Sequence, residues 1–322
     1  MPFAALLVLA LGLSLLGTLF NLPQRVVDAA PARPDIVMFY MDDFAPYPSR
    51  MWDREARTPE LARFADQGLE FENAIASTPL CGPSRANLLT GKYSHNNGLT
   101  KNNIGPYKPR NSVPVKLGNK GYRTVFVGKH INRLAKEYPS RRSMRRLSSN
   151  WDRFDAIWEN QGKFYDWRQY RKDDTRRYGS GAYSHSSYRA AQRAVKHIKS
   201  TPRGKPLFLV VSLVDGHIPM TPMKRFRNHP SCQIMAPWDG PAFNEADVSD
   251  KPEHIRKTPR LSEPTSGLRK RCEQALTVDW VVGQVRKELK QRGRVDTTLQ
   301  ILTSDTGWLM GDHRLEGKVH PY

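Results

Sequence analysis

The chain has 322 residues, enough for one large domain or two small ones, and its 51 lysine and arginine residues against 31 acidic residues give a net charge of +20. Such a charge favours a polyanionic partner, whether nucleic acid, anionic membrane or sulfated glycan. The basic residues are scattered and match no nucleic-acid-binding motif, so nucleic acid is not expected as a partner, and their mild clusters at 141–146, 168–177 and 269–271 are equally compatible with a solvated surface.

The first 32 residues are typical of an export segment. An apolar run from Pro2 to Phe20 precedes small residues at 29–32, which is the pattern of a secretory signal cleaved near Ala30 or Ala32. An N-terminal membrane anchor is the alternative, because the run approaches the length that spans a bilayer and no Lys or Arg precedes it. Either interpretation predicts a secreted or cell-envelope protein whose folded domain is residues 33–322.

The folded part alternates predicted strands with predicted helices, which indicates an α/β fold with a mostly parallel central sheet flanked by helices. The segments 134–180 and 220–263 are predicted to be irregular, and the first of these to run over the surface. Strands or extended segments are expected at 35–40, 69–75, 123–127, 207–213 and 297–303. Helices are expected at 58–68, 83–90, 113–119, 183–199 and 268–291, and Thr58 is the expected N-cap of the first.

Polar clusters directly follow four of the predicted strands. Because ligands in open α/β sheets bind beyond the carboxyl ends of the strands, these side chains are expected at one rim of the sheet. Asp42, Asp43 and Asp305 among them form a set of hard oxygen donors suited to Ca²⁺, with Mg²⁺ as the alternative. Adjacent aspartates alone could equally lie in a solvated turn. The clusters are Asp42-Asp43, Lys129-His130, Asp215 with His217, and Ser304-Asp305.

The most specific motif is Cys81-Gly-Pro-Ser-Arg85. Its spacing suits neither a zinc site nor a redox Cys-x-x-Cys pair. A helix that begins at Pro83 would present free N–H groups near Cys81, an arrangement that favours an anion. The other two cysteines, Cys232 and Cys272, could pair, but Cys272 fits the apolar stripe of the 268–291 helix, so a buried thiol is preferred there.

The Cys81 motif resembles the signature of the type I sulfatases, in which a formylglycine-generating enzyme oxidises this cysteine to Cα-formylglycine. The segments 96–99 and 243–252 further resemble the N-acetylglucosamine-6-sulfatase and heparan-sulfatase branch. The resemblance implies an alkaline-phosphatase-like sandwich fold. Matching segments are Arg33-Pro34-Asp35 with Asp42-Asp43, Gly128-Lys129, Asp215-Gly216-His217, and Thr303 to Lys318.

The resemblance also implies roles for individual residues. Ca²⁺, with Mg²⁺ as the alternative, would be held by Asp42, Asp43, the formylglycine made from Cys81, Asp305 and Thr306. A metal-bound hydroxyl of the hydrated formylglycine would attack sulfur. The catalytic set would be Cys81, Arg85, Lys129, His217 and Lys318, with His217 protonating the departing sugar oxygen.

The sequence departs from the family pattern at two positions and at its end. Thr306 stands where relatives carry Asn, His or Gln as a further metal ligand. Ile131 holds a position that is histidine in many relatives, so the preceding His130 either substitutes for that histidine or faces solvent. Relatives also continue beyond the second lysine, so residues 33–322 are interpreted as the N-terminal part of the catalytic domain, without its C-terminal subdomain.

The sequence therefore predicts a sulfuric ester hydrolase that acts on a sulfated amino sugar or a glycosaminoglycan. Two alternatives stay open. A phosphate or phosphonate ester hydrolase would use the same scaffold with a different ester. A catalytically impaired glycan-binding homologue would account for Thr306 and for the early end of the chain.

Overall fold

The computed structural model of the chain describes residues 33–45, 57–71, 73–159, 161–172, 174–233, 240–262 and 267–320. The predicted signal or anchor segment lies outside these residues. Residues 34–322 form one compact unit. Within the described ranges no helix is long and apolar enough to cross a membrane.

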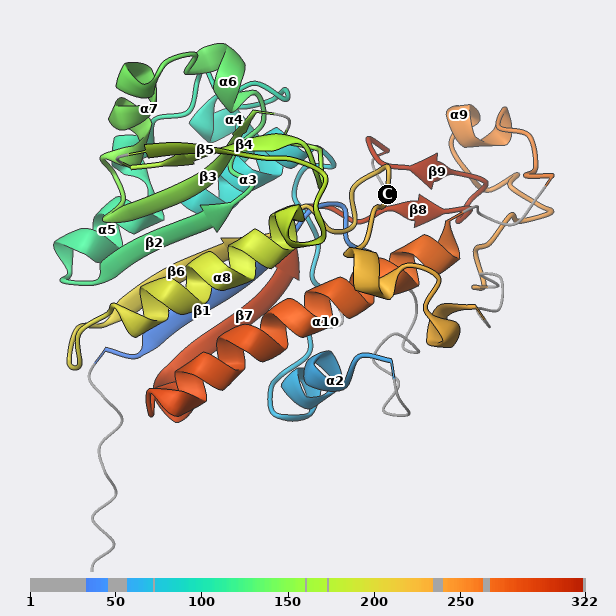
Figure 1. Ribbon diagram of the computed structural model, residues 1–322. Coiled ribbons are helices and arrows are strands. Elements are labelled where there is room, and N and C mark those ends of the chain that lie inside the picture. Colours follow the sequence, from blue (N-terminus) through green and yellow to red (C-terminus); the bar gives the residue numbers. More distant parts are fainter. Residues whose placement is uncertain are drawn as a thin grey trace, which may run out of the picture. The chain divides into compact units, whose positions relative to one another are not determined.

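The centre of the fold is a seven-stranded sheet with the strand order β5-β4-β3-β2-β6-β1-β7 (Figure 1). Five neighbouring strands, from β3 to β7 in that order, are parallel, and β4 and β5 continue the sheet in antiparallel fashion. This confirms the predicted mostly parallel α/β fold. The strands are β1 (Asp35–Met41), β2 (Arg123–Gly128), β3 (Arg153–Glu159), β4 (Trp167–Arg171), β5 (Asp174–Tyr178), β6 (Leu207–Ser212) and β7 (Thr298–Ser304).

Helices cover both faces of the sheet, as expected for a parallel sheet whose central strands are apolar on both sides. On one face α8 (Ser186–Lys199), α10 (Leu268–Gln291) and α2 (Pro59–Asp66) bury side chains such as Phe39 and Leu209. On the other face α3 (Cys81–Thr90), α6 (Leu134–Glu137) and α7 (Arg141–Ser148) pack on Tyr40, Phe126 and Phe154, with α5 (Val113–Asn119) at the margin. The central strands are therefore held between two apolar layers.

Short elements complete the chain. A small β-hairpin of β8 (Leu309–Met310) and β9 (Glu316–Gly317) follows β7. The connection from β6 to α10 is mostly irregular, as predicted. The remaining short helices are α4 (Ser94–Asn97), α9 (Glu253–Arg256), η2 (Pro109–Asn111), η3 (Ala182–Ser184), η4 (Lys224–Phe226), η5 (Pro230–Cys232) and η6 (Val295–Thr297).

Two segments differ from their predicted structure. The stretch 134–180, expected to run irregularly over the surface, instead contributes α6, α7 and three strands of the sheet. The described residues of 69–75, predicted to be extended, form no strand, and Leu69, Phe71 and Ile75 are largely exposed. In β4 of the first segment, Trp167 and Gln169 are buried and Arg168 between them is partly exposed. The many arginines of this segment make such an alternation of buried and exposed residues hard to recognise in the sequence.

The N-terminus of α2 is capped from another helix. Thr58 occupies the N-cap position as predicted, but its side chain makes no capping hydrogen bond. Instead, Asp279 of α10 accepts hydrogen bonds from the backbone N–H groups of Glu60 and Leu61 at 2.8 and 2.9 Å. This carboxylate satisfies donors that a helix N-terminus leaves unpaired, and it fixes α2 to α10.

Cys232 and Cys272 form a disulfide, which corrects the preference for a buried thiol at Cys272. The apolar stripe of α10 was identified correctly, because Cys272 is buried on it. The prediction was wrong because η5 packs on this stripe and brings Cys232 within a Cα–Cα distance of 5.6 Å. Cys81 is the remaining cysteine, and its thiol is free and buried.

Candidate active site

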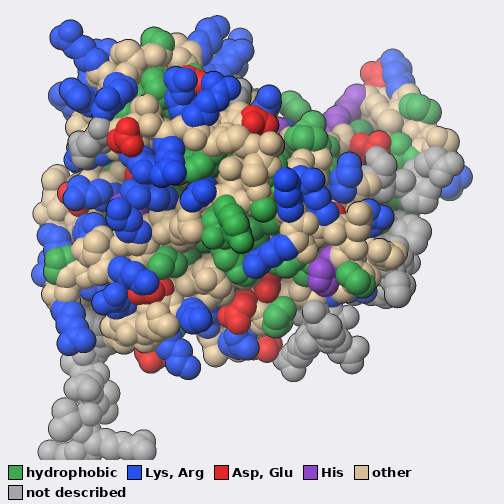
Figure 2. All heavy atoms as spheres, in the orientation of Figure 1, with side chains coloured by type: hydrophobic (Ala, Val, Ile, Leu, Met, Phe, Trp, Pro, Cys, Tyr) green, Lys and Arg blue, Asp and Glu red, His purple; other side chains and the backbone are tan. Residues whose placement is uncertain are grey.

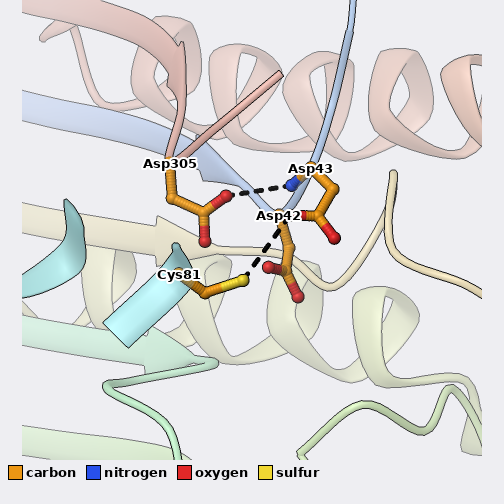
Figure 3. A group of neighbouring side chains, drawn as sticks. All are labelled: Asp42, Asp43, Cys81 and Asp305. Atoms are coloured by element: carbon orange, nitrogen blue, oxygen red, sulfur yellow. Dashed lines mark hydrogen bonds between the residues drawn. The ribbon is translucent and has the colours of Figure 1, made fainter. Parts of the chain in front are cut away.

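Asp42, Asp43 and Asp305, which follow two of the parallel strands, meet at one rim of the sheet, as predicted. Asp42 and Asp43 follow β1, Asp305 follows β7, and Cys81 is the first residue of α3 (Figure 3). One potential ligand atom of each residue lies within 4.8 Å of the others, and all four side chains are buried. The strand ends thus bring together residues that are far apart in the sequence.

Cys81 lies between a carboxylate and an ammonium group. Its Sγ is 3.5 Å from Asp43 Oδ1, and Lys318 Nζ donates to the sulfur at 2.9 Å. Burial, together with the negative charge of Asp42, raises the pKa of the thiol well above its ordinary value. The unmodified thiol is therefore a poor nucleophile, because the thiolate is the reactive form.

Asp43 is the point where most of the predicted site residues converge. Lys318 Nζ contacts its carboxylate at 2.6 and 2.8 Å, and Thr306 Oγ1 donates to Oδ1 at 2.7 Å. His217 Nε2 lies 3.9 Å from Oδ2. The backbone N–H of Asp43 donates to Asp305 Oδ1 at 2.9 Å. The hydroxyl of Thr306 therefore reaches the cluster despite its short side chain.

Asp42 is ionised and retains an unused oxygen. Lys129 Nζ forms an ion pair with Oδ2, and Arg85 Nη2 lies 3.5 Å from Oδ1. Although burial alone would raise the pKa of Asp42, these two cations hold it well below its ordinary value. Asp42 Oδ1 is buried and accepts no hydrogen bond from the described residues. Beyond the ion pair with Arg85, this buried oxygen therefore has lone pairs available for a further cation.

Arg85 holds the rim together rather than facing outward. Its guanidinium binds Asp305 Oδ2 at 2.7 Å, the Lys129 carbonyl at 2.7 Å and Ser212 Oγ at 2.8 Å. The side chain is almost completely buried and stacks on the ring of Tyr40. These contacts join the ends of four elements, and they engage both the Nε and the Nη1 of the guanidinium.

Asp305 is less strongly ionised than Asp42. Burial raises the pKa of Asp305 to about 6, with Arg85 opposing the shift. Ser84 Oγ donates to the Asp305 carbonyl and so fixes the backbone of this residue against α3. A cation bound beside Asp305 would favour its ionised form by the same Coulombic effect that Arg85 exerts.

His217 reaches the rim on a loop that packs closely against the first two aspartates. Gly216 has a φ of 109°, and a Cβ at this position would lie only 2.2 Å from the Asp42 carbonyl oxygen. Glycine is therefore required for this close approach. Burial lowers the pKa of His217, although the charge of Asp42 opposes the shift. The nearby carboxylate charge favours the imidazolium form of His217, which is the form that can donate a proton.

The donor set fits a hard divalent cation. Three carboxylates supply oxygen ligands, and one oxygen of Asp42 lacks a protein donor. The three carboxylates, taken without Cys81 Sγ, are ligands of the kind that bind Ca²⁺ or Mg²⁺, and Ca²⁺ tolerates irregular geometry better. In the described structure Lys129 and Lys318 supply the positive charge that neutralises Asp42 and Asp43.

One predicted candidate lies apart from this cluster. His130 neither faces solvent nor joins the cluster, because its ring is buried among Tyr107, Phe126 and Phe154. Burial lowers the pKa of His130 to about 3, so the imidazole is neutral. The expectation that His130 faces solvent is therefore wrong, and the geometry gives no support to a catalytic role.

Sequence reasoning missed several residues that support the site. Ser212 donates to the Lys129 carbonyl, and Gln274 Oε1 accepts from the Gly216 N–H at 3.1 Å. Arg271 of α10 contacts Asp43, because its Nη1 lies 3.5 Å from the Asp43 carbonyl oxygen. The same guanidinium lies over the ring of Trp308, 5.0 Å from the ring centroid. Ser212 ends an apolar strand and could have been recognised as its first polar residue, whereas nothing local distinguishes Gln274 or Arg271.

The comparisons with known proteins agree with this geometry. A family model described as Sulfatase matches residues 34–321. The chain is 27% identical over 312 residues to N-acetylglucosamine-6-sulfatase of Homo sapiens, which covers 90% of this chain and 54% of that protein. It is 30% identical over 326 residues to an extracellular sulfatase SULF-1 homolog of Drosophila melanogaster, which covers 91% of this chain and 27% of that protein.

The fold is also similar to that of a solved structure described as being in complex with its substrate D-glucosamine-2-N,6-O-disulfate. The TM-score is 0.65 at 18% identity, and the match covers 90% of this chain and 69% of that chain. The chain thus spans about half the length of the human relative and about a quarter of the length of the fruit-fly relative.

Proposed function

Because the chain belongs to the sulfatase family, we propose that it is a sulfuric ester hydrolase that removes sulfate from a sulfated amino sugar or a glycosaminoglycan. The observation that carries the proposal is the position of Cys81, whose Sγ lies between Lys318 and Asp43 in a buried cluster of three aspartates. The amino-sugar substrate is supported by the names of the human relative and of the substrate bound in the solved structure.

The nucleophile is derived from Cys81 rather than being the thiol itself, because the buried thiol has a raised pKa. Asp42, Asp43 and Asp305, together with the modified residue 81, would hold a divalent cation that acidifies the attacking hydroxyl and polarises a sulfuryl oxygen. Ca²⁺ is the proposed cation, with Mg²⁺ as the alternative. Thr306 contributes through its hydrogen bond to Asp43.

Lys318 and Lys129 provide positive charge at the reacting centre. Lys318 Nζ already contacts the sulfur of Cys81, so it lies where the oxygens of a transferred sulfuryl group would be. Lys129 pairs with Asp42, which directly follows β1. Fixed cations in a buried site stabilise developing negative charge without reorganising, and this effect is often worth several kcal/mol.

His217 is the proposed acid that protonates the departing sugar oxygen. Its ring is partly accessible at the rim, with a side-chain exposure of 23%, whereas the aspartates are fully buried. The sugar therefore approaches from the side of His217, while the sulfuryl group points inward to the cluster. Arg85 acts through Asp305 and the Lys129 carbonyl, which it holds in position.

Export to the cell surface or outside the cell is part of the proposal. It is supported by the extracellular fruit-fly relative and by the Cys232–Cys272 disulfide, because disulfides persist mainly in oxidising compartments. A formylglycine-generating enzyme would be required during maturation.

Two measurements on the purified full chain test the proposed function. Mass spectrometry of the peptide that contains Cys81 should show the mass of formylglycine, and aryl sulfate should be hydrolysed in a metal-dependent way. Cys81→Ala should abolish turnover. A chain with unmodified Cys81 and no sulfate release would refute the proposal, and faster turnover of aryl phosphate than of aryl sulfate would favour the phosphate or phosphonate hydrolase instead.

A further inference from the structure

Basic side chains, blue in Figure 2, cover much of the visible face, and those on α7 and the strands β4 and β5 are mostly arginines. Five of them define a surface that we name the arginine face. Its residues are Arg142, Arg145 and Arg146 of α7, Arg168 of β4 and Arg177 of β5.

The arginines of α7 lie together on its outer side. In Arg141-Arg142-Ser143-Met144-Arg145-Arg146-Leu147-Ser148, the residues Met144 and Leu147 are buried, whereas the arginines are exposed. Residues three and four apart lie on one side of a helix, so the spacing places like charges next to one another. The helix carries no acidic residue, and among the described residues Arg142, Arg145 and Arg146 form no ion pair.

The strands extend this surface. Arg168 of β4 lies directly opposite Arg177 of β5, a like-charge pairing that is unfavourable in a sheet. Alternation along β4 places Arg168 on the same side as Tyr170, whose hydroxyl lies 3.2 Å from Ser148 Oγ at the end of α7. Charge on an edge strand prevents edge-to-edge pairing and explains Arg177 by itself. It does not explain the arginines of α7, which lie on no strand edge.

The arginine face is connected to the rim of the proposed active site. Arg168 stacks over the ring of Trp158 at 5.9 Å and pairs with Glu159 at 2.9 Å. The loop that follows β3 then reaches His217, because a Cβ at Gly162 would lie 3.5 Å from the imidazole Cε1. On the other side, Trp158 Nε1 donates to the Tyr138 carbonyl in the connection between α6 and α7.

We propose that the arginine face binds an extended sulfated polysaccharide whose reacting sugar lies at Cys81. This inference rests on the proposed function for the identity of the polymer. The planar guanidinium forms paired hydrogen bonds with oxyanions, which favours arginine over lysine for binding sulfate groups along a chain. A substrate longer than the catalytic site would thus be held by charge at a distance from the reaction.

The composition of this surface argues against the other polyanions. Insertion into a membrane interface needs exposed apolar side chains, and the large exposed ones of the described chain, such as Phe71 and Ile75, lie on other elements. Single-stranded nucleic acid is bound by stacking of bases on exposed aromatic rings, and here Trp158 and Tyr178 are buried. A flexible sulfated chain requires neither feature.

The test compares two triple variants of the full chain with the same change in charge. Arg142→Gln, Arg145→Gln and Arg146→Gln are combined in the first, and Arg203→Gln, Lys287→Gln and Lys290→Gln, which lie on exposed positions elsewhere, in the control. Each lost ion pair at an exposed site weakens binding by roughly two- to three-fold, so affinity for heparin dodecasaccharide should fall about ten-fold in the first variant only. Arg177→Gln alone should give a smaller loss.

Heparin affinity is measured by calorimetry, and turnover of aryl sulfate, which should change less than two-fold, is measured in parallel. Equal loss of heparin affinity in both triple variants would overturn the proposal, because only net charge would then matter. The proposal would also be overturned if duplex DNA or phosphatidylserine vesicles, at matched charge, displaced the chain from heparin as well as heparin itself does. The chain could also bind heparin through the arginine face but release sulfate from no substrate. That outcome would refute the proposed function and still support this binding surface.

Discussion

Replacing Gly216 by alanine tests whether the loop after β6 fixes the two aspartates that follow β1. The added Cβ would lie 2.2 Å from the Asp42 carbonyl oxygen and 2.7 Å from the Phe44 N atom. Ordinary contacts between such atoms are about 3.5 Å long, so the backbone on one side would have to move by roughly 1 Å. Since both neighbouring groups are main-chain atoms, no side chain can rotate away to relieve the overlap.

The expected cost combines two effects. Alanine at positive φ loses roughly 1 kcal/mol relative to glycine, and overpacking of a dense interior costs about 1–3 kcal/mol. The free energy of unfolding of Gly216→Ala should therefore fall by about 2–4 kcal/mol. A displacement of about 1 Å at catalytic groups lowers turnover by on the order of 10²-fold, so aryl sulfatase activity should fall by that factor.

Gly204→Ala is the matched control, because Gly204 has a φ of 77° and a Cβ placed there would have no atom within 4 Å. This variant should lose only the roughly 1 kcal/mol that positive φ costs alanine. Urea denaturation measures the stability of both variants, and aryl sulfate turnover measures the site. If Gly216→Ala matched Gly204→Ala in both assays, the loop would not hold Asp42 and Asp43 in place.

The contacts of the site and of α2 support three further predictions. Lys318→Met should lower kcat on aryl sulfate by on the order of 10²–10³-fold, because it removes the cation beside Cys81, whereas Lys116→Met on exposed α5 should not. Ca²⁺ at a hundred times its Kd should stabilise the chain by about 2.7 kcal/mol in thermal denaturation, and Asp305→Asn should remove most of that gain. Burial raises the pKa of Asp279 to about 6, so its contribution to stability is complete below about pH 4 and is lost as the pH rises through 6. Urea denaturation of Asp279→Asn should lack this loss, whereas Asp279→Ala should be less stable by about 1–3 kcal/mol throughout, because two N–H groups of α2 lose their acceptor.

The rim of the sheet could be predicted from sequence because its determinants are local. Each contributing strand is a short apolar run followed at once by polar residues, as in β1 with Asp42 and Asp43. Parallel pairing of β1 with β6 and β7 then aligns the carboxyl ends without further information. The cluster of Asp42, Asp43 and Asp305 follows from strand recognition and from one general property of parallel sheets.

The features that sequence reasoning missed depend on contacts between distant segments. The acceptor that caps α2 is Asp279, 219 residues after Glu60, so no capping pattern near Thr58 could reveal it. The disulfide depends in the same way on how η5 packs against α10. His130 was misplaced for a different reason, because a polar residue after a strand was assumed to face outward, whereas a neutral imidazole packs well among aromatic rings.

The burial of Cys81 limits when the proposed oxidation of its thiol could take place. In the folded chain the thiol is inaccessible, so an enzyme that oxidises it must act before α3 docks on the sheet. Lys318, the last residue to contact the sulfur, is synthesised 237 residues after Cys81. At about 5–20 residues per second, translation leaves the cysteine without this partner for roughly 10–50 s. On the proposed route, the yield of active protein therefore depends on whether Cys81 is oxidised before Lys318 reaches it, and slower translation between these two residues would raise that yield.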